Sequence, residues 1–430
     1  MWRRRQDPDR AAPEAALGAI LAAVLAILAL IGPAPAWAAE TAAAKEPAGA
    51  APAEPMHVIV GYLGQEEVPR QPLSFLEPEL QDEGVQGARL GIADTNTTGR
   101  FLNQRFDLVE AVIPRNTDPA VAIAAQMQAL ADKGVRLLVA DLPAERLVQA
   151  LDQPAAGGML VLNARAPDDN LRNEACRPNL LHTIPSRRML ADALAQYLVW
   201  KRWTRWMLVA GRYPEDLAYA EALRRAARKF GAKIVEQKSW TFEEGNRRAD
   251  SGHTTVQSLV PTMTQGADHD VLVVADERDI FGEYLPFRTA EPRLVAGTQG
   301  LVPTNWSRVH EQWGATQLHS RFEKLAGRWM TPRDHAAWVA VRAVGEAATR
   351  TRSADPEQLS RFITGPDFTL AAFKGQALSF RPWDGQLRQP VLLAGPRMLV
   401  SVSPQDGFLH RVTTLDTLGD DQSDSRCTRQ

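Results

Sequence analysis

The chain has 430 residues, of which 45% are hydrophobic and 23% charged, with 49 Lys and Arg against 51 Asp and Glu. The near balance of charge argues against nucleic acid or a membrane surface as a partner, because both attract strongly basic proteins. The length exceeds what one hydrophobic core usually organises, so we expect two lobes.

The N-terminus has the pattern of an export signal. Three arginines at residues 3–5 precede an unbroken apolar run over 15–31, and Ala36-Trp37-Ala38 offers the small residues that a signal peptidase requires. We predict a cleavable signal peptide over residues 1–38 and a periplasmic location. The alternative is an uncleaved membrane anchor, since the run approaches the roughly 18 apolar residues typical of a spanning helix. Helix-breaking residues before the cleavage position favour the signal peptide.

Removal of residues 1–38 takes away four basic and three acidic residues and leaves 45 against 48, a net charge of about −3. Residues 39–55 are mainly Ala, Pro, Glu and Lys. They have too few large apolar side chains to pack, so we predict a disordered linker there.

Buried-type strands then alternate with helices. The first series has strands at 57–63, 107–113, 135–140 and 159–163, and helices at 83–102, 119–133 and 143–151. Continuously apolar strands that alternate with helices indicate a parallel sheet covered on both faces.

A second series of the same kind follows a crossing strand at 180–184. Ser186 is a suitable N-cap for a helix at 187–201, and Gly231 suits the end of a helix at 217–230. The strands of this series are predicted at 206–211, 233–240, 270–275 and 293–297. Three helices at 311–329, 334–350 and 356–363 and short strands at 377–380, 389–394 and 398–403 complete the chain.

The fold class is therefore α/β, with two mostly parallel sheets flanked by helices and a ligand cleft between two lobes, because open parallel sheets bind ligands beyond the carboxyl ends of their strands. We place the first lobe at 56–182 plus about 304–351, the second at 183–303 plus about 352–415, and a C-terminal tail at 416–430.

Cys176 and Cys427 are the two cysteines of the chain. In an oxidising compartment such a pair usually forms one disulfide, which here would pin the C-terminal tail to a loop. Two free thiols are the alternative. Two cysteines alone do not make a zinc site.

The common catalytic motifs are absent from the sequence. It contains no His-Glu-x-x-His, Gly-x-Ser-x-Gly or Gly-x-x-x-x-Gly-Lys-Ser segment, and its eight histidines show no metal-ligand spacing. We expect a binding protein that is not an enzyme and needs no catalytic cofactor or metal.

The order of elements over about 56–410 resembles the type I periplasmic solute-binding proteins of the branched-chain amino acid class. The segment DHAAWVAVRAVGEAAT (334–349) is similar to an aromatic helix of that family, and Trp383-Asp384-Gly385 is similar to its late hairpin. The resemblance implies a monomer that closes on a small molecule by hinge motion and delivers it to the permease of an ABC transporter in the inner membrane.

A narrower resemblance is carried by four short segments. GTQGLVP (297–303), QLRQP (386–390), SPQDGFLH (403–410) and LDTLG (415–419) are similar to an ABC-transporter substrate-binding subfamily that accompanies alcohol dehydrogenases dependent on pyrroloquinoline quinone (PQQ). This resemblance implies PQQ, or a related planar anionic solute, as the ligand.

The chain departs from the amino-acid-binding pattern at two positions. The turn after the third strand reads Asp141-Leu142-Pro143-Ala144, without the hydroxyls that hold a ligand carboxylate in that family, and Gln299 stands at the position of its ammonium-binding acid. A neutral amide does not offset the cost of burying a cation. We therefore expect an ordinary α-amino acid to be a poor ligand.

The candidate ligand-binding residues follow the predicted strands. They are Arg146, Asn163, Arg165, Arg212, Tyr213, Asp276, Arg278, Gln299 and Trp306. Arginine suits carboxylates, and the aromatic side chains suit a planar ring. Each residue has a plainer alternative: an ion pair for the arginines, core packing for Trp306, and orientation of an arginine for Asp276.

The predicted function is the periplasmic substrate-binding component of an ABC transporter. The alternatives are a periplasmic sensory or regulatory module, or a receptor for another small carboxylate or amino-acid-like solute.

Overall fold

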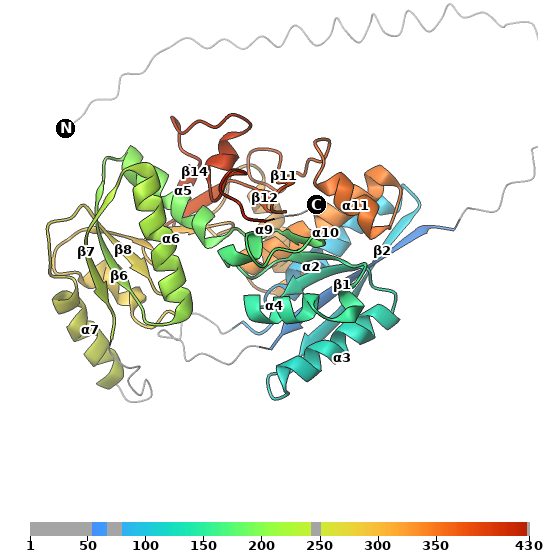
Figure 1. Ribbon diagram of the computed structural model, residues 1–430, viewed down its shortest axis with the longest axis horizontal. Coiled ribbons are helices and arrows are strands. Elements are labelled where there is room, and N and C mark those ends of the chain that lie inside the picture. The colour runs from blue at the N-terminus through green and yellow to red at the C-terminus, as the bar shows by residue number, and fades with distance from the viewer. Residues whose placement is uncertain (1–53, 67–79, 242–250, 428–430) are drawn as a thin grey trace, which may run out of the picture. The chain divides into compact units, whose positions relative to one another are not determined.

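Two parallel sheets organise the parts of the chain that this computed structural model describes, residues 54–66, 80–241 and 251–427 (Figure 1). The predicted signal peptide and the linker up to residue 53 lie outside the described residues. In the described segments, no helix combines the length and the apolar character that crossing a membrane requires.

The first sheet has five parallel strands in the order β2-β1-β3-β4-β5. They are β1 (Met56–Gln65), β2 (Gln104–Ile113), β3 (Leu137–Asp141), β4 (Leu160–Asn163) and β5 (Leu180–His182). The helices of this series are α2 (Val85–Gly99), α3 (Pro119–Asp132) and α4 (Ala144–Leu151). The predicted alternation is confirmed, except that the predicted crossing strand is the last strand of this sheet.

The second sheet has four parallel strands in the order β7-β6-β8-β9. They are β6 (Arg205–Ala210), β7 (Lys233–Ser239), β8 (Val271–Ala275) and β9 (Leu294–Gly297). Its helices are α5 (Arg187–Trp200), α6 (Pro214–Phe230), α7 (Ser251–Met263) and α8 (Leu285–Arg288). Figure 1 shows α6 and α7 beside strands β6 and β8. Both predicted caps are confirmed: Ser186 Oγ accepts a hydrogen bond from Met189 N, and Gly231 has a φ of 79°.

A third, antiparallel sheet of three strands joins segments that follow the second series. It pairs β10 (Val302–Thr304) with β13 (Val391–Ala394), and β13 with β14 (Leu399–Ser403). The other late elements are α9 (Ala315–Ala326), α10 (Pro332–Thr351), α11 (Pro356–Ile363), β11 (Ser379–Phe380) and β12 (Leu387–Arg388).

Core packing assigns the late helices to the first sheet. One buried cluster joins Val58 and Val60 of β1 with Val341 of α10, and it also includes Leu359 and Ile363 of α11. We had predicted that residues from about 352 belong to the second lobe. The lobe boundaries stay a prediction. The packing favours an assignment of α11, and of the segment up to Leu387, to the first lobe.

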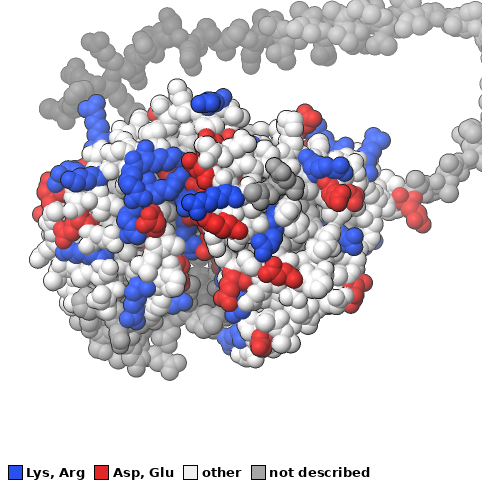
Figure 2. Space-filling view, in the orientation of Figure 1, with Lys and Arg blue, Asp and Glu red and all other residues white. Residues whose placement is uncertain are grey.

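Basic side chains gather over α5 and α6 on the face seen in Figure 2. Several of these basic residues form ion pairs with the carboxylates of two aspartates. Arg225 and Lys229 reach the buried Asp192 at 3.2 Å and 2.6 Å, and Arg188 and Arg225 reach Asp420 at 2.6 Å and 2.9 Å. Asp420 belongs to the C-terminal tail, so this patch serves to hold the tail.

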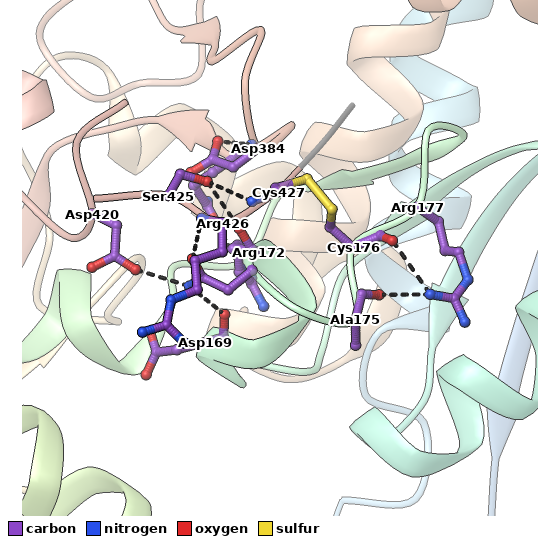
Figure 3. The surroundings of a disulfide bond; sticks show 12 residues. Asp169, Arg172, Ala175, Cys176, Arg177, Asp384, Asp420, Ser425, Arg426 and Cys427 are labelled. Carbon is purple, nitrogen blue, oxygen red and sulfur yellow. Dashed lines mark hydrogen bonds between the residues drawn. A yellow bond between two sulfur atoms is a disulfide. The ribbon is translucent and has the colours of Figure 1, made fainter. Parts of the chain in front are cut away.

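The predicted disulfide is confirmed, because Cys176 is bonded to Cys427 (Figure 3). It ties the end of the tail to the loop between β4 and β5. Two hydrogen bonds support the same contact: Asn173 Nδ2 donates to Asp420 Oδ2 at 3.0 Å, and Arg426 N donates to Asn173 Oδ1 at 3.0 Å. The tail therefore contacts both the first sheet's loop and the helices of the second series.

Helices α2 and α10 approach closely because α2 carries a glycine at the contact. A Cβ added to Gly87 would lie 1.9 Å from the carbonyl oxygen of Asp334. Asp334 itself caps α10 and accepts a hydrogen bond from Gly84 N at 2.8 Å. The start of α10 is thereby held against the start of α2.

We predict that Gly87→Ala lowers the free energy of unfolding by about 2 kcal/mol, since the overpacking outweighs the better helix propensity of alanine. Urea unfolding measures the change. Gly395→Ala is the matched control, because its nearest neighbour would be 3.7 Å from the new Cβ. Equal stabilities of the two variants would contradict the close contact.

We predict that replacing both cysteines with serine costs about 2–4 kcal/mol of stability, because the bond closes a long loop between residues separated by 251 positions. Denaturant unfolding with and without a reductant measures this effect. The reductant should destabilise the wild type and leave the double variant unchanged. A wild type that does not respond to reduction would argue against the bond.

Candidate ligand-binding site

Asp141 ends β3 at the position where we expected the first sheet to meet a ligand. Its carboxylate is 1% exposed and is bound within the protein. Tyr62 Oη donates to Asp141 Oδ2 at 2.6 Å, while Arg333 donates through Nε to Oδ1 at 3.1 Å and through Nη2 to Oδ2 at 2.7 Å. The sequence pattern did not reveal Tyr62 or Arg333, because they lie far from Asp141 along the chain.

These contacts keep Asp141 charged. Burial raises the pKa of the Asp141 carboxyl, but the charge and hydrogen bonds of Arg333, the charge of Arg165 and the Tyr62 hydroxyl together hold it below its usual value. Burial, reinforced by the charge of Asp141, raises the pKa of Tyr62 far above its usual value. The tyrosine is thus a neutral donor and the aspartate a neutralised anion.

Gly84 closes over this ion pair. It has a φ of 77°, and a Cβ there would lie 2.4 Å from Asp141 Oδ2 and 2.7 Å from Tyr62 Oη. Arg333 also contacts Glu83 Oε2 at 3.2 Å. The edge of the first sheet beside β3 is therefore filled by the protein's own charges.

The other predicted residues of the first sheet have different surroundings. Asn163 is buried and donates to Ala166 O, while its Oδ1 accepts from the backbone N–H groups of Arg165 and Ala166, so the amide shapes the turn after β4. Arg146 pairs within α4, where Nη1 donates to Gln149 Oε1 at 2.9 Å. Arg165 is half-buried and close enough to Asp141 to affect its pKa.

Four predicted residues of the second sheet follow β6 and β8. Arg212 and Arg278 both lie over the ring of Tyr213, with guanidinium carbons 5.6 Å and 4.0 Å from its centroid. Arg278 also pairs with Glu215 at 2.6 Å. Arg212, Tyr213 and Asp276 share a small hollow. The structure thus brings together the residues predicted at this edge.

The acidic residues at this edge are bound to backbone groups. Asp276 is fully buried and accepts hydrogen bonds from the N–H groups of Ile280, Phe281 and Gly282. Asp216 accepts from Glu277 N at 2.7 Å, and burial raises its pKa to about 6. Arg212 is exposed and forms no ion pair with any described residue. Arg212 is therefore a cation at this edge that no carboxylate of the described residues pairs with.

Arg187 connects the two sheets at their carboxyl ends. Its guanidinium binds Asp168, which follows β4, at 2.8 Å, and Glu277, which follows β8, at 2.7 Å. The prediction missed this role. A cation in the first turn of a helix opposes the helix dipole, and that unfavourable placement is the signal that could have marked Arg187.

Gln299 and Trp306 lie together in a separate hollow beside β10. Its volume is about 380 Å³, within the range of small-molecule pockets. The Gln299 side-chain amide also donates to Asp279, next to the Arg212 hollow. Trp306 is 1% exposed and stacks on His335, as its core-packing alternative expects, and its contact with a ligand stays a prediction.

Comparisons with known proteins agree with this architecture. A family model described as a periplasmic binding protein matches residues 79–247, which is less than half of the chain. A search of curated proteins found no match.

Solved structures match over most of their length. A branched-chain amino acid ABC transporter periplasmic ligand-binding protein from Burkholderia xenovorans is 14% identical, with a TM-score of 0.65, and the match covers 86% of this chain and 99% of that one. A leucine-, isoleucine-, valine-, threonine- and alanine-binding protein from Brucella ovis is 13% identical, with a TM-score of 0.62 and coverage of 86% and 97%.

A third structure was determined with an aromatic acid. It is a solute-binding protein of an ABC transporter from Rhodopseudomonas palustris in complex with 3,4-dihydroxybenzoic acid, 12% identical, with a TM-score of 0.57 and coverage of 81% and 97%. The chain therefore has the two-sheet type I periplasmic binding protein fold, as predicted from its order of elements.

We predict that Asp141→Asn lowers the free energy of unfolding by about 2 kcal/mol near neutral pH, because it removes a buried anion from Arg333 while Glu83 remains a partner. The folded-state pKa is depressed, so the stabilisation is complete above the unfolded pKa of about 4 and is lost as the pH falls through the folded value.

Unfolding measurements at about pH 7 and about pH 3 test this prediction, since the gap between wild type and variant should narrow in acid. Asp107→Asn is the control, because Asp107 pairs with Arg105 at the surface with its side chain 37% exposed. That change should cost less than about 0.5 kcal/mol. A larger loss for the surface variant would refute the assignment.

Proposed function

We propose that this chain is the periplasmic substrate-binding component of an ABC transporter, and that it binds PQQ or a related planar anionic solute. The main support comes from the edge of the second sheet, where Arg212 and Arg278 lie over the ring of Tyr213 at the carboxyl ends of β6 and β8. Open parallel sheets bind ligands at these ends.

The chemistry of this edge favours an anion with a flat ring. A guanidinium group donates two hydrogen bonds to one carboxylate, and an aromatic face packs against a planar ring. The acids nearby are already bound to backbone N–H groups or to arginine. A negative ligand there could pair with Arg212, while the carboxylates of Asp216 and Asp276 that line the same hollow are held by backbone N–H groups.

The first sheet argues against an ordinary amino acid. Asp141, Arg333 and Tyr62 fill the place where the amino-acid-binding family holds a ligand carboxylate, and Gln299 supplies no charge for an ammonium group. The ligand of the Rhodopseudomonas palustris protein, 3,4-dihydroxybenzoic acid, is planar and anionic. It provides a precedent on this fold for the ligand class proposed.

The location, the oligomeric state and the transport role in this proposal follow from the resemblance to type I periplasmic solute-binding proteins. The predicted signal peptide places a monomer in the periplasm, where it closes on its solute by hinge motion and delivers it to a permease. The PQQ assignment rests on the four short segments similar to the subfamily that accompanies PQQ-dependent alcohol dehydrogenases. Binding involves no covalent chemistry and no catalytic cofactor.

Titration of the purified protein without residues 1–38 tests this function. We expect PQQ or 3,4-dihydroxybenzoate to change the tryptophan fluorescence at micromolar concentrations, and leucine to leave it unchanged. Arg212→Ala should weaken binding about tenfold, the typical worth of a hydrogen-bonded charge.

Arg100→Ala is the control for that substitution, since Arg100 is exposed at the far end of α2. Tight binding of leucine with no response to either acid, in protein shown to be folded by circular dichroism, would reject the proposed ligand class.

A further inference from the structure

We propose that the hollow beside β10 is an anion-binding subsite, in which Arg308 binds a carboxylate and Trp329 contacts a planar ring. This inference rests on the proposed function and adds to the Arg212 edge a second group that recognises charge. None of the sequence patterns pointed to Arg308 or Trp329.

The wall of the hollow carries one charged side chain. Among the described residues that line it, Arg308 is the only cation and there is no Asp or Glu. The histidines packed beside Trp306 add no charge, because burial lowers the pKa of His310, His319 and His335 below the usual value. An anion that enters would therefore meet a single positive group and no negative one.

Arg308 is placed for a ligand and not for an internal ion pair. Its guanidinium carbon lies 5.0 Å from the ring centroid of Trp329, and the side chain is exposed. It forms no salt bridge with any residue in the described parts of the chain. The basic residues over α5 and α6 differ, since Arg188, Arg225 and Lys229 all bind carboxylates. A guanidinium stacked on an aromatic ring keeps its in-plane N–H groups available for a carboxylate.

Trp306 forms a rigid part of the wall of the hollow. Its ring stacks on His335 with centroids 4.2 Å apart and an angle of 8°, and the residue is 1% exposed. Its Nε1 has no hydrogen-bond partner among the described residues. Because Nε1 is shielded from solvent, Trp306 contributes an apolar wall to the hollow, and recognition of charge falls to Arg308.

The hollow also joins segments that belong to different sheets. Gln299 and Gly300 follow β9 of the second sheet, whereas Pro332 begins α10, which packs on the first sheet, and Trp329 lies three residues before it. A ligand that contacts both sides binds one relative arrangement of the sheets better than others. Such differential binding is what shifts a two-lobed protein toward its closed form.

Calorimetric titration of the chain without residues 1–38 tests the subsite. The probes are 3,4-dihydroxybenzoate, PQQ and the neutral 3,4-dihydroxybenzamide. We expect Arg308→Ala to weaken binding of at least one acid about tenfold and Arg308→Lys to retain part of the affinity. The neutral amide lacks the carboxylate, so its affinity for the wild type should be no higher than the affinity of dihydroxybenzoate for Arg308→Ala. Arg100→Ala should bind like the wild type, and thermal melting of each variant verifies the fold.

The outcomes separate the two proposals. If an acid binds the wild type and Arg308→Ala changes its affinity by less than about twofold, the subsite is overturned and the proposed function stands. If Arg308→Ala reduces affinity for the acid and the amide equally, Arg308 does not recognise charge and the inference also fails. If neither acid binds folded wild-type protein, both proposals are rejected together.

Discussion

The ion pair of Asp141 with Arg333 is the interaction on which the character of the site depends. It is buried between β3 and the start of α10, capped by Tyr62 and by the close approach of Gly84. Because this pair neutralises itself, the first sheet offers a ligand little charge at the turn after β3. Arg212 after β6 and Arg308 beside β10 lie elsewhere and have no carboxylate partner among the described residues. In the proposed function, the groups that would select an anion therefore lie in the second sheet and in the connecting segments.

Much of the fold could be predicted from periodicity. Runs such as residues 137–140 and 271–275 are continuously apolar and lie in buried parallel strands, and Ser186 and Gly231 delimit helices through local chemistry. Tertiary contacts decided the rest. The crossing strand predicted at 180–184 pairs with β4, and α11 packs in the core of the first sheet because Leu359 and Ile363 complete a cluster that no local pattern reveals.

Residues of the candidate site could be predicted only where they directly follow the ends of strands. That rule located Arg212, Tyr213, Arg278 and Asp276, and the structure places them together. It could not indicate which of them are already bound, such as Asp276 on three backbone N–H groups, nor which residues arrive from distant segments. Arg187, Arg308 and Arg333 came from helices or loops whose neighbours are set by folding, so their roles became visible only in three dimensions.

We propose that the protein encloses a planar anion between its two sheets, with guanidinium groups as the recognition elements. A crystal structure of the protein grown with PQQ or 3,4-dihydroxybenzoate would show whether it does. We predict ligand density that contacts both sheets, with a carboxylate within hydrogen-bonding distance of Arg308 or Arg212 and the Asp141 to Arg333 pair intact. A ligand whose carboxylate instead displaces Asp141 from Arg333, or one bound outside both arginine sites, would contradict it.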